Sequence, residues 1–147
     1  MQALNHTVFG SLIAVTITEP AIALPLALAS HFILDMIPHY GDDPKSPRGS
    51  KSYYIRIVVD IIACFIVGGI FLSLNPPHAG LIVACIWVSV APDILWPLAL
   101  FIKQKGILWN FFKFHKKIQR ESRSGIYLEI VWFAVTVMLF LGQVNKL

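Results

Sequence analysis

The stretch PAIALPLALASHFILDMIPHY, residues 20–40, decides how this chain folds. Residues 20–37 are apolar except for a few polar side chains, of which only Asp35 carries a fixed charge. A membrane-spanning helix needs about 17–25 mostly apolar residues, so this run is long enough to cross. Pro38 disfavours helix at the residue before it, which leaves His39 at the polar rim. The stretch therefore predicts a membrane helix that carries ionisable side chains near one end.

The rest of the chain has the same character. The 147 residues are 56% hydrophobic and 14% charged, with a mean hydropathy of +0.70. A soluble domain is about one quarter charged, and so few charges cannot cover a surface that faces water. The composition excludes a soluble enzyme, a nucleic-acid-binding domain and a disordered chain. We interpret residues 1–147 as a single integral membrane domain.

Three further apolar runs qualify as spans: residues 57–74, 79–102 and 126–144. Residues 4–17 are short for a span, and they either cross with local thinning of the bilayer or stop partway. Residues 107–121 place apolar side chains on one helical stripe and basic ones mostly on the other, which predicts an amphipathic helix in the inner interface. The predicted fold class is all-α: a polytopic transmembrane bundle of about four full spans, a short N-terminal helix and an interfacial helix.

Basic residues gather in two loops, at about residues 39–55 and 103–124. The excess of Lys and Arg in cytoplasmic loops places both loops inside, so the C-terminus lies outside. The N-terminus lies inside if residues 4–17 also cross. The predicted location is the cell (inner) membrane. The predicted partners are membrane lipids, with anionic headgroups at the basic interfacial helix, and not nucleic acid. Self-association into a homo-oligomer stays open.

Several ionisable residues interrupt the apolar runs, where a charge costs about 2.5–3.5 kcal/mol even on the lower scales. Such groups face the bundle interior and often mark functional sites. His31 and Asp35 are one helical turn apart, so they share a helix face. An imidazole and a carboxylate at this spacing form either two ligands of a divalent metal or a hydrogen-bonded pair that braces two helices.

Residues 4–17 and 20–37 are predicted to form an antiparallel hairpin that turns at Thr18-Glu19. Small residues at every fourth position in both segments would let the two helices approach closely. With the turn placed there, the numbers of facing residues sum to 37. The pairs that result are His6 with His31, Gly10 with Ala27, and Ala14 with Ala23.

Asp93 is the next candidate for the same polar site. It lies about ten residues before Lys103, or roughly 15 Å into the membrane at helical rise. The depth of His31 is comparable, so we expect Asp93 to complete the site. The alternative is that Asp93 only caps the half-helix that begins after Pro92.

The remaining ionisable residues in apolar segments carry less information. Asp60 stands one turn after Arg56, and Glu129 lies in the first turns of the last span; we interpret both as mainly structural. His115 lies on the apolar stripe of residues 107–121, where a packing role and a site role both stay open.

Two short pieces of the sequence, NHTVFG (residues 5–10) and SHFILD (residues 30–35), resemble the H-x3-G and sH-x3-D signatures of a family of small bacterial inner-membrane proteins, the membrane-bound metal-dependent hydrolases. The segment H-x3-D-x2-P-H is similar, more distantly, to the His/Asp ligand segment of zinc-dependent phospholipase C. The resemblance implies a set of metal ligands: His6, His31, Asp35 and His39.

A third element, Pro92-Asp93, resembles the P-D-x-D-H element of the same family. Leu95 replaces its second aspartate and Trp96 its histidine, and the element stands in a different order along the chain. Because these two residues differ from the family's pattern, the resemblance gives weaker support for a second metal and for catalytic activity.

The first functional hypothesis is a membrane-bound metal-dependent hydrolase. One divalent metal, Zn²⁺ first, would activate a water that cleaves a lipid-linked or headgroup ester or phosphoester. The expected ligands are His6, His31, Asp35 and Asp93, with His39 at the mouth. Asp35, Asp93 and His39 are the candidates for catalytic roles. The alternatives are a non-catalytic membrane helper protein and a small transporter that handles ions or protons.

Overall fold

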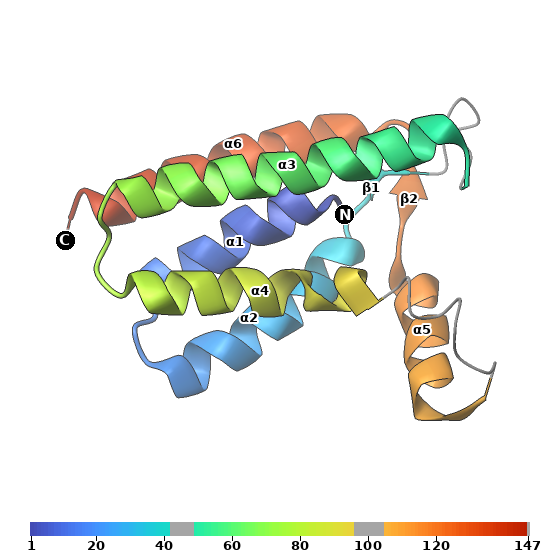
Figure 1. Ribbon diagram of the computed structural model, residues 1–147, viewed down its shortest axis with the longest axis horizontal. Helices are drawn as coiled ribbons and strands as arrows, with labels where there is room; N and C mark the ends of the chain where they lie inside the picture. The colour runs from blue at the N-terminus through green and yellow to red at the C-terminus, as the bar shows by residue number, and fades with distance from the viewer. Residues whose placement is uncertain (42–48, 96–104, 147) are drawn as a thin grey trace.

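The structure, a computed structural model, describes residues 1–41, 49–95 and 105–146 (Figure 1). The helices in chain order are α1 (Ala3–Thr16), α2 (Pro20–Asp35), α3 (Lys51–Ser73), α4 (Ala79–Leu95), α5 (Gly106–Ile118) and α6 (Gly125–Val144). Two short strands, β1 (His39–Tyr40) and β2 (Glu121–Ser122), pair in parallel at one end of the bundle. The predicted all-helical fold class is confirmed.

The shortest of the bundle helices, α1, lies at its centre. It packs against α2, α3, α4 and α6, and it buries polar as well as apolar side chains. Val8 and Ala14 of α1 belong to a core that also contains Phe71 and Phe140, whose rings stack with centroids 3.9 Å apart. Because protein surrounds α1, its polar side chains do not have to face lipid.

The predicted hairpin of the first two helices is present. Thr16 ends α1, Pro20 begins α2, and the Glu19 side chain between them accepts a hydrogen bond from the Ala21 amide at 3.4 Å. The hairpin brings His6 against His31, as the register predicted.

Gly10, which the register placed opposite Ala27, makes its close approach to α4 instead. A Cβ on Gly10 would lie 2.6 Å from Ser89 Oγ and 2.8 Å from the carbonyl oxygen of Cys85. Glycine is therefore required where α1 meets α4. Small residues on a helix permit this kind of contact with any neighbouring helix, and sequence spacing alone does not say which one.

Within the described residues, two helices, α3 and α6, are long and apolar enough to cross a membrane, in place of the four full spans predicted. At 1.5 Å per residue, the 14 residues of α1 and 16 of α2 reach about 21 and 24 Å, short of a hydrocarbon core of about 30 Å. The helix of α2 ends at Asp35 because the chain then turns into β1. Residues 96–102 of the predicted 79–102 span lie outside the described residues, as do residues 42–48 and 103–104 of the predicted loops.

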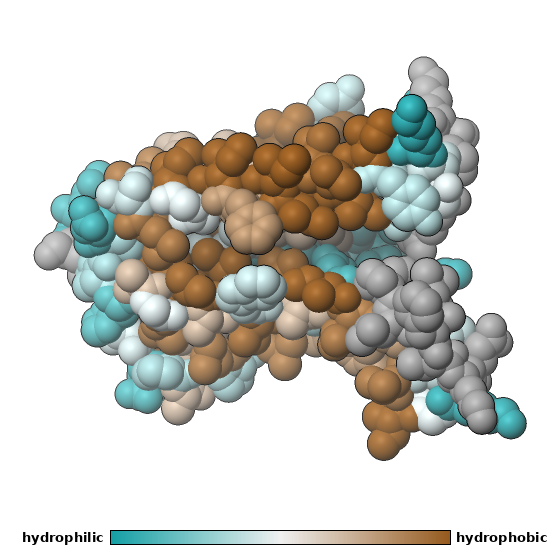
Figure 2. Space-filling view, in the orientation of Figure 1, coloured by the Kyte–Doolittle hydropathy of each residue, from teal (hydrophilic) through white to brown (hydrophobic). Residues whose placement is uncertain are grey.

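Most apolar side chains of α3 and α6 point away from the protein. Phe65 is 69% exposed and Met138 is 72% exposed. Figure 2 shows a continuous hydrophobic surface along α3. Soluble proteins rarely expose apolar patches of this extent, so this surface suits contact with lipid.

The helix α5 corresponds to the amphipathic segment predicted at residues 107–121. It runs across one end of the bundle, steeply inclined to the long helices (Figure 1). Its C-terminal end is attached to α2, because the amide of Arg120 donates to the Asp35 carbonyl oxygen at 3.1 Å. The Arg120 carbonyl accepts in turn from the amide of His39, also at 3.1 Å. These backbone bonds fix α5 beside the end of α2.

Candidate metal centre

Side chains from α2, α4 and α5 converge at the end of the bundle where α5 crosses. His31, Asp35, Asp93 and His115 each offer one ligand atom, and these atoms all lie within 4.8 Å of one another. Asp35 Oδ2 is 2.8 Å from His115 Nε2 and 3.2 Å from His31 Nε2. The two imidazole nitrogens are 3.0 Å apart. Asp93 Oδ1 lies 3.8 Å from each of them.

The topology explains why these residues meet. The helices α1 and α2 form one helical hairpin, and α3 and α4 form the next. The second helix of each hairpin returns to the same end of the bundle, where α2 packs against α4. Asp35 is the last residue of α2, and Asp93 lies in the last turn of α4. The C-terminal end of a helix carries a partial negative charge, which favours cations. The C-terminal end of α2 and the two carboxylates therefore favour a cation at this point, where the Met1 ammonium group already forms an ion pair with Asp35.

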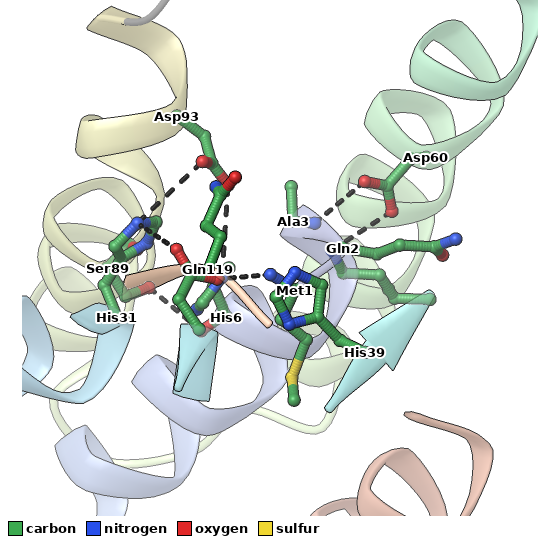
Figure 3. A network of polar contacts seen from close by, with 12 residues as sticks. Met1, Gln2, Ala3, His6, His31, His39, Asp60, Ser89, Asp93 and Gln119 are labelled. Carbon is green, nitrogen blue, oxygen red and sulfur yellow. Dashed lines mark hydrogen bonds and ion pairs between the residues drawn. The ribbon is translucent and has the colours of Figure 1, made fainter. Parts of the chain in front are cut away.

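A hydrogen bond orients His31 for the site. Its Nδ1–H donates to the carbonyl oxygen of Ser89 at 2.8 Å, so in the neutral ring the lone pair is on Nε2, the atom that faces the carboxylates. The Ser89 hydroxyl donates to the carbonyl oxygen of His6 at 2.9 Å, which ties α4 to α1 (Figure 3). Histidines that bind metals usually donate their other ring N–H to a carbonyl or carboxylate in this way.

His6 brings a further imidazole to the site from α1. Its ring stacks on that of His31, and its Nε2 lies 3.3 Å from Asp35 Oδ1 and 3.9 Å from Asp93 Oδ2. The side chain is fully buried. Within the part of the chain that the structure describes, neither ring nitrogen of His6 has a hydrogen-bond partner of good geometry. A buried polar group without a partner is costly, so this ring suits a site that holds a cation or water.

The four converging residues fit a divalent metal ion. Metal–nitrogen bonds of about 2.0–2.1 Å in tetrahedral geometry hold the ligand atoms about 3.3 Å apart. The five separations that involve His31 or His115 within this group run from 2.8 to 3.8 Å, on both sides of that value, and all four ligand atoms lie within 4.8 Å of one another. Imidazole and carboxylate are ligands that zinc and neighbouring divalent metals accept. The group could hold a metal ion whose identity the ligand types do not fix.

Carboxylates from two other helices bind the first turn of α1. Asp60 of α3 accepts hydrogen bonds from the amides of Ala3 and Leu4, at 2.8 and 3.1 Å (Figure 3). Glu129 of α6 accepts from the Gln2 amide at 2.8 Å. The first amides of a helix have no partner within it, so these contacts cap α1. They agree with the mainly structural roles predicted for Asp60 and Glu129.

His39 lies apart from the group of four. Its Nδ1–H donates to the Ile37 carbonyl oxygen at 2.8 Å, and its backbone pairs with β2. Figure 3 shows its ring beside Met1, whose ammonium group forms an ion pair with Asp35. The ring is buried, and burial lowers the pKa of His39 below its usual value. His39 contributes no ligand atom to the group that the structure describes, which corrects its predicted place at the mouth.

Sequence reasoning found most of this site. His6, His31, Asp35 and Asp93 come together as predicted. His115, for which a packing role stayed open, is a member of the group. Ser89 was missed, although its position one helical turn before Asp93, inside an apolar run, was a usable signal because residues at this spacing share a helix face.

Comparison with known proteins adds no relative. No protein-family profile matches the chain, and no curated protein or solved structure is significantly similar to it.

Proposed function

We propose that this chain is an integral membrane hydrolase that holds one divalent metal ion, zinc being the first candidate. The observation that carries the proposal is the convergence of His31, Asp35, Asp93 and His115 within 4.8 Å. Side-chain hydrogen bonds between membrane helices contribute about 0.6 kcal/mol on average, whereas each buried charge costs about 2.5–3.5 kcal/mol. Two carboxylates gathered with two imidazoles at one point are better explained by a bound ion than by helix cohesion.

In this proposal α3 and α6 cross the inner membrane, and α1, α2 and α4 cross where the bilayer thins around them. The basic loops and the N-terminus lie in the cytoplasm, and the C-terminus lies outside. Two observations support this arrangement: the uneven distribution of Lys and Arg, and the apolar surfaces of α3 and α6.

When bound, a divalent ion supplies a Lewis acid and lowers the pKa of a water molecule that it coordinates. His31 and His115 contribute imidazole nitrogens, and Asp35 contributes the carboxylate between them. Asp93 is the member that reaches solvent, with 28% of its side chain exposed, so it is placed to receive a proton from water. His6, next to both carboxylates, keeps them oriented.

The substrate class in this proposal is a lipid-linked or headgroup ester or phosphoester. Its support is the position of α5, which brings His115 to the site and carries exposed basic side chains on the same helix. These are Lys113, Lys116 and Lys117. Basic residues close to a membrane surface attract anionic headgroups, by about 1 kcal/mol each.

The test is elemental analysis of the detergent-purified protein, with Asp35→Ala beside the wild type. We expect about one divalent metal per wild-type chain and a near-complete loss in the variant, because a buried site rarely survives removal of its central ligand. Vesicles of phosphatidylethanolamine and phosphatidylglycerol then serve as substrate for headgroup release, with and without chelator. His78→Asn, in an exposed loop, is the matched control.

The result that contradicts the proposal is a wild-type protein without stoichiometric metal. If Asp35→Ala then only lowers the unfolding temperature, the polar cluster holds helices together. Metal-dependent ion flux into proteoliposomes, without ester cleavage, would support the transport alternative instead.

A further inference from the structure

The helix that supplies His115 is held to the bundle by few side chains. In α5 only Phe112 and His115 are buried. Phe32 of α2 contacts this part of α5, with its ring centroid 6.0 Å from that of His115 and 5.9 Å from that of Phe114. Together with the Arg120 backbone bonds, these contacts fix the C-terminal half of α5.

The rest of α5 exposes apolar side chains. Ile107 is 88% exposed, and Leu108 and Phe114 are each more than half exposed. Figure 1 shows the N-terminal part of α5 extending beyond the long helices. A helix of 13 residues is marginally stable in water by itself, so α5 needs a surface that covers these side chains.

The chemistry of α5 identifies that surface. The helix exposes apolar residues on one side and Lys113, Lys116 and Lys117 on the other, which is the composition of a helix that lies in the headgroup layer of an anionic bilayer. The steep angle between α5 and the long helices agrees, because an interfacial helix lies across the direction of the spans (Figure 1). The apolar, outward-facing sides of α3 and α6 suit contact with lipid around the same bundle.

We infer that the site is coupled to the membrane surface. An anionic bilayer binds α5 and fixes its position, and α5 in this position holds His115 against Asp35 so that the metal binds tightly. This inference rests on the proposed metal site. Without α5 in place the site keeps His31, Asp35 and Asp93 but loses its second imidazole. Coupling is reciprocal, so metal bound to His115 also strengthens the attachment of α5 to the bilayer.

The experiment measures metal affinity with the full chain in nanodiscs, by competition between Zn²⁺ and a chromophoric chelator. One set of discs contains phosphatidylcholine alone, and the other contains phosphatidylcholine with phosphatidylglycerol. We expect a Kd at least about fivefold lower in the anionic discs, the lower end of typical coupling between two sites. The triple variant K113Q/K116Q/K117Q should bind metal in both discs without this difference. Lys146→Gln, which removes a basic side chain beyond the other end of the bundle, should keep it.

The variants distinguish binding of α5 to the bilayer from a simpler cause, the accumulation of metal cations near any negatively charged surface. Accumulation predicts the same enhancement in wild type, triple variant and His115→Ala, and that result overturns the inference. Equal affinities for the wild type in both discs overturn it as well, while leaving the metal site intact. If the wild type binds no metal in either kind of disc, anionic or neutral, the proposed function and the inference are both wrong. Circular dichroism of each variant in the same discs confirms that the helices are retained.

Discussion

The imidazole rings of His6 and His31 stack with their centroids 4.2 Å apart and their planes inclined by 27°. The two residues belong to different helices, and both side chains are fully buried. Stacking places both Nε2 atoms beside Asp35, at 3.3 and 3.2 Å from its carboxylate oxygens. The pair therefore combines one imidazole of the four-residue group with one that lies immediately outside it.

This difference predicts unequal effects on metal binding. His31→Asn should abolish stoichiometric metal, because it removes a direct ligand. His6→Asn should leave metal bound but weaken it about 10–100-fold, the usual effect of losing a residue that orients a ligand. Competition titration in detergent measures both.

His78→Asn is the control for this pair, since His78 is exposed and its positive φ of 59° is a conformation that asparagine tolerates. A His6→Asn protein with no metal at all would make His6 a ligand in its own right. A metal affinity that His6→Asn leaves unchanged would show that His6 has no role in metal binding.

The sequence was sufficient to predict the pairing of His6 with His31, because one turn position fixes the register of a short helical hairpin. It was not sufficient for the contacts of Gly10 or His115. Gly10 packs against Cys85 and Ser89 of α4, and α5 is attached through a backbone bond from Arg120 to Asp35; both contacts join segments distant in the chain. Sequence periodicity carries no information about those contacts.

The ends of the helices were also partly beyond prediction. Apolar length and Pro38 placed the end of the second segment at residue 37, but α2 ends at Asp35 and the chain then turns toward β1. The pairing of β1 with β2 requires Gly125, at which a Cβ would lie 2.1 Å from the carbonyl carbon of His39. A two-residue strand has no periodicity to detect, so only the folded chain shows this contact.

Gly10→Ala should force α1 and α4 apart. Its Cβ would lie 2.8 Å from a backbone oxygen of Cys85, which cannot rotate away as a side chain can. Overpacking of this kind typically costs about 1–3 kcal/mol, and here it should also weaken metal binding, because Ser89 orients His31. Unfolding in detergent gives the first quantity and metal titration the second.

Gly69→Ala is the matched control, because a Cβ at Gly69 of α3 has nothing within 4 Å. Equal stability of the two variants would show that α1 and α4 do not pack as closely as the structure has them.

Asp60→Ala should destabilise the protein through α1. The substitution leaves the amides of Ala3 and Leu4 without their acceptor, and loss of a helix cap costs about 0.5–2 kcal/mol. Asp60→Asn keeps one acceptor oxygen and should cost less. The free energy of unfolding in mild detergent tests this order. Glu19→Ala, which removes an exposed cap contact of 3.4 Å, should have a smaller effect. If Asp60→Ala lowers the free energy of unfolding no more than Glu19→Ala does, the cap that Asp60 of α3 provides for α1 does not stabilise the protein.

The pH dependence of stability should carry a contribution from His39. Burial lowers the pKa of this imidazole in the folded protein, whereas the unfolded chain has a value near 6.5. As the pH falls below about 6.5, the unfolded state takes up a proton that the folded state resists, so the free energy of unfolding decreases. The loss continues until the pH reaches the lowered pKa. Above about pH 7.5 the ring is neutral in both states and contributes no slope.

His39→Gln removes this contribution, so the unfolding temperatures of wild type and variant should converge between about pH 7.5 and pH 5. Comparing the two proteins cancels the titration of the other histidines. His78→Asn, a substitution at an exposed position, is the control, and its curve should stay parallel to that of the wild type. A His39→Gln curve that also stayed parallel would mean that the ring can take up its proton without leaving its buried position beside Ile37, and the burial argument would not hold.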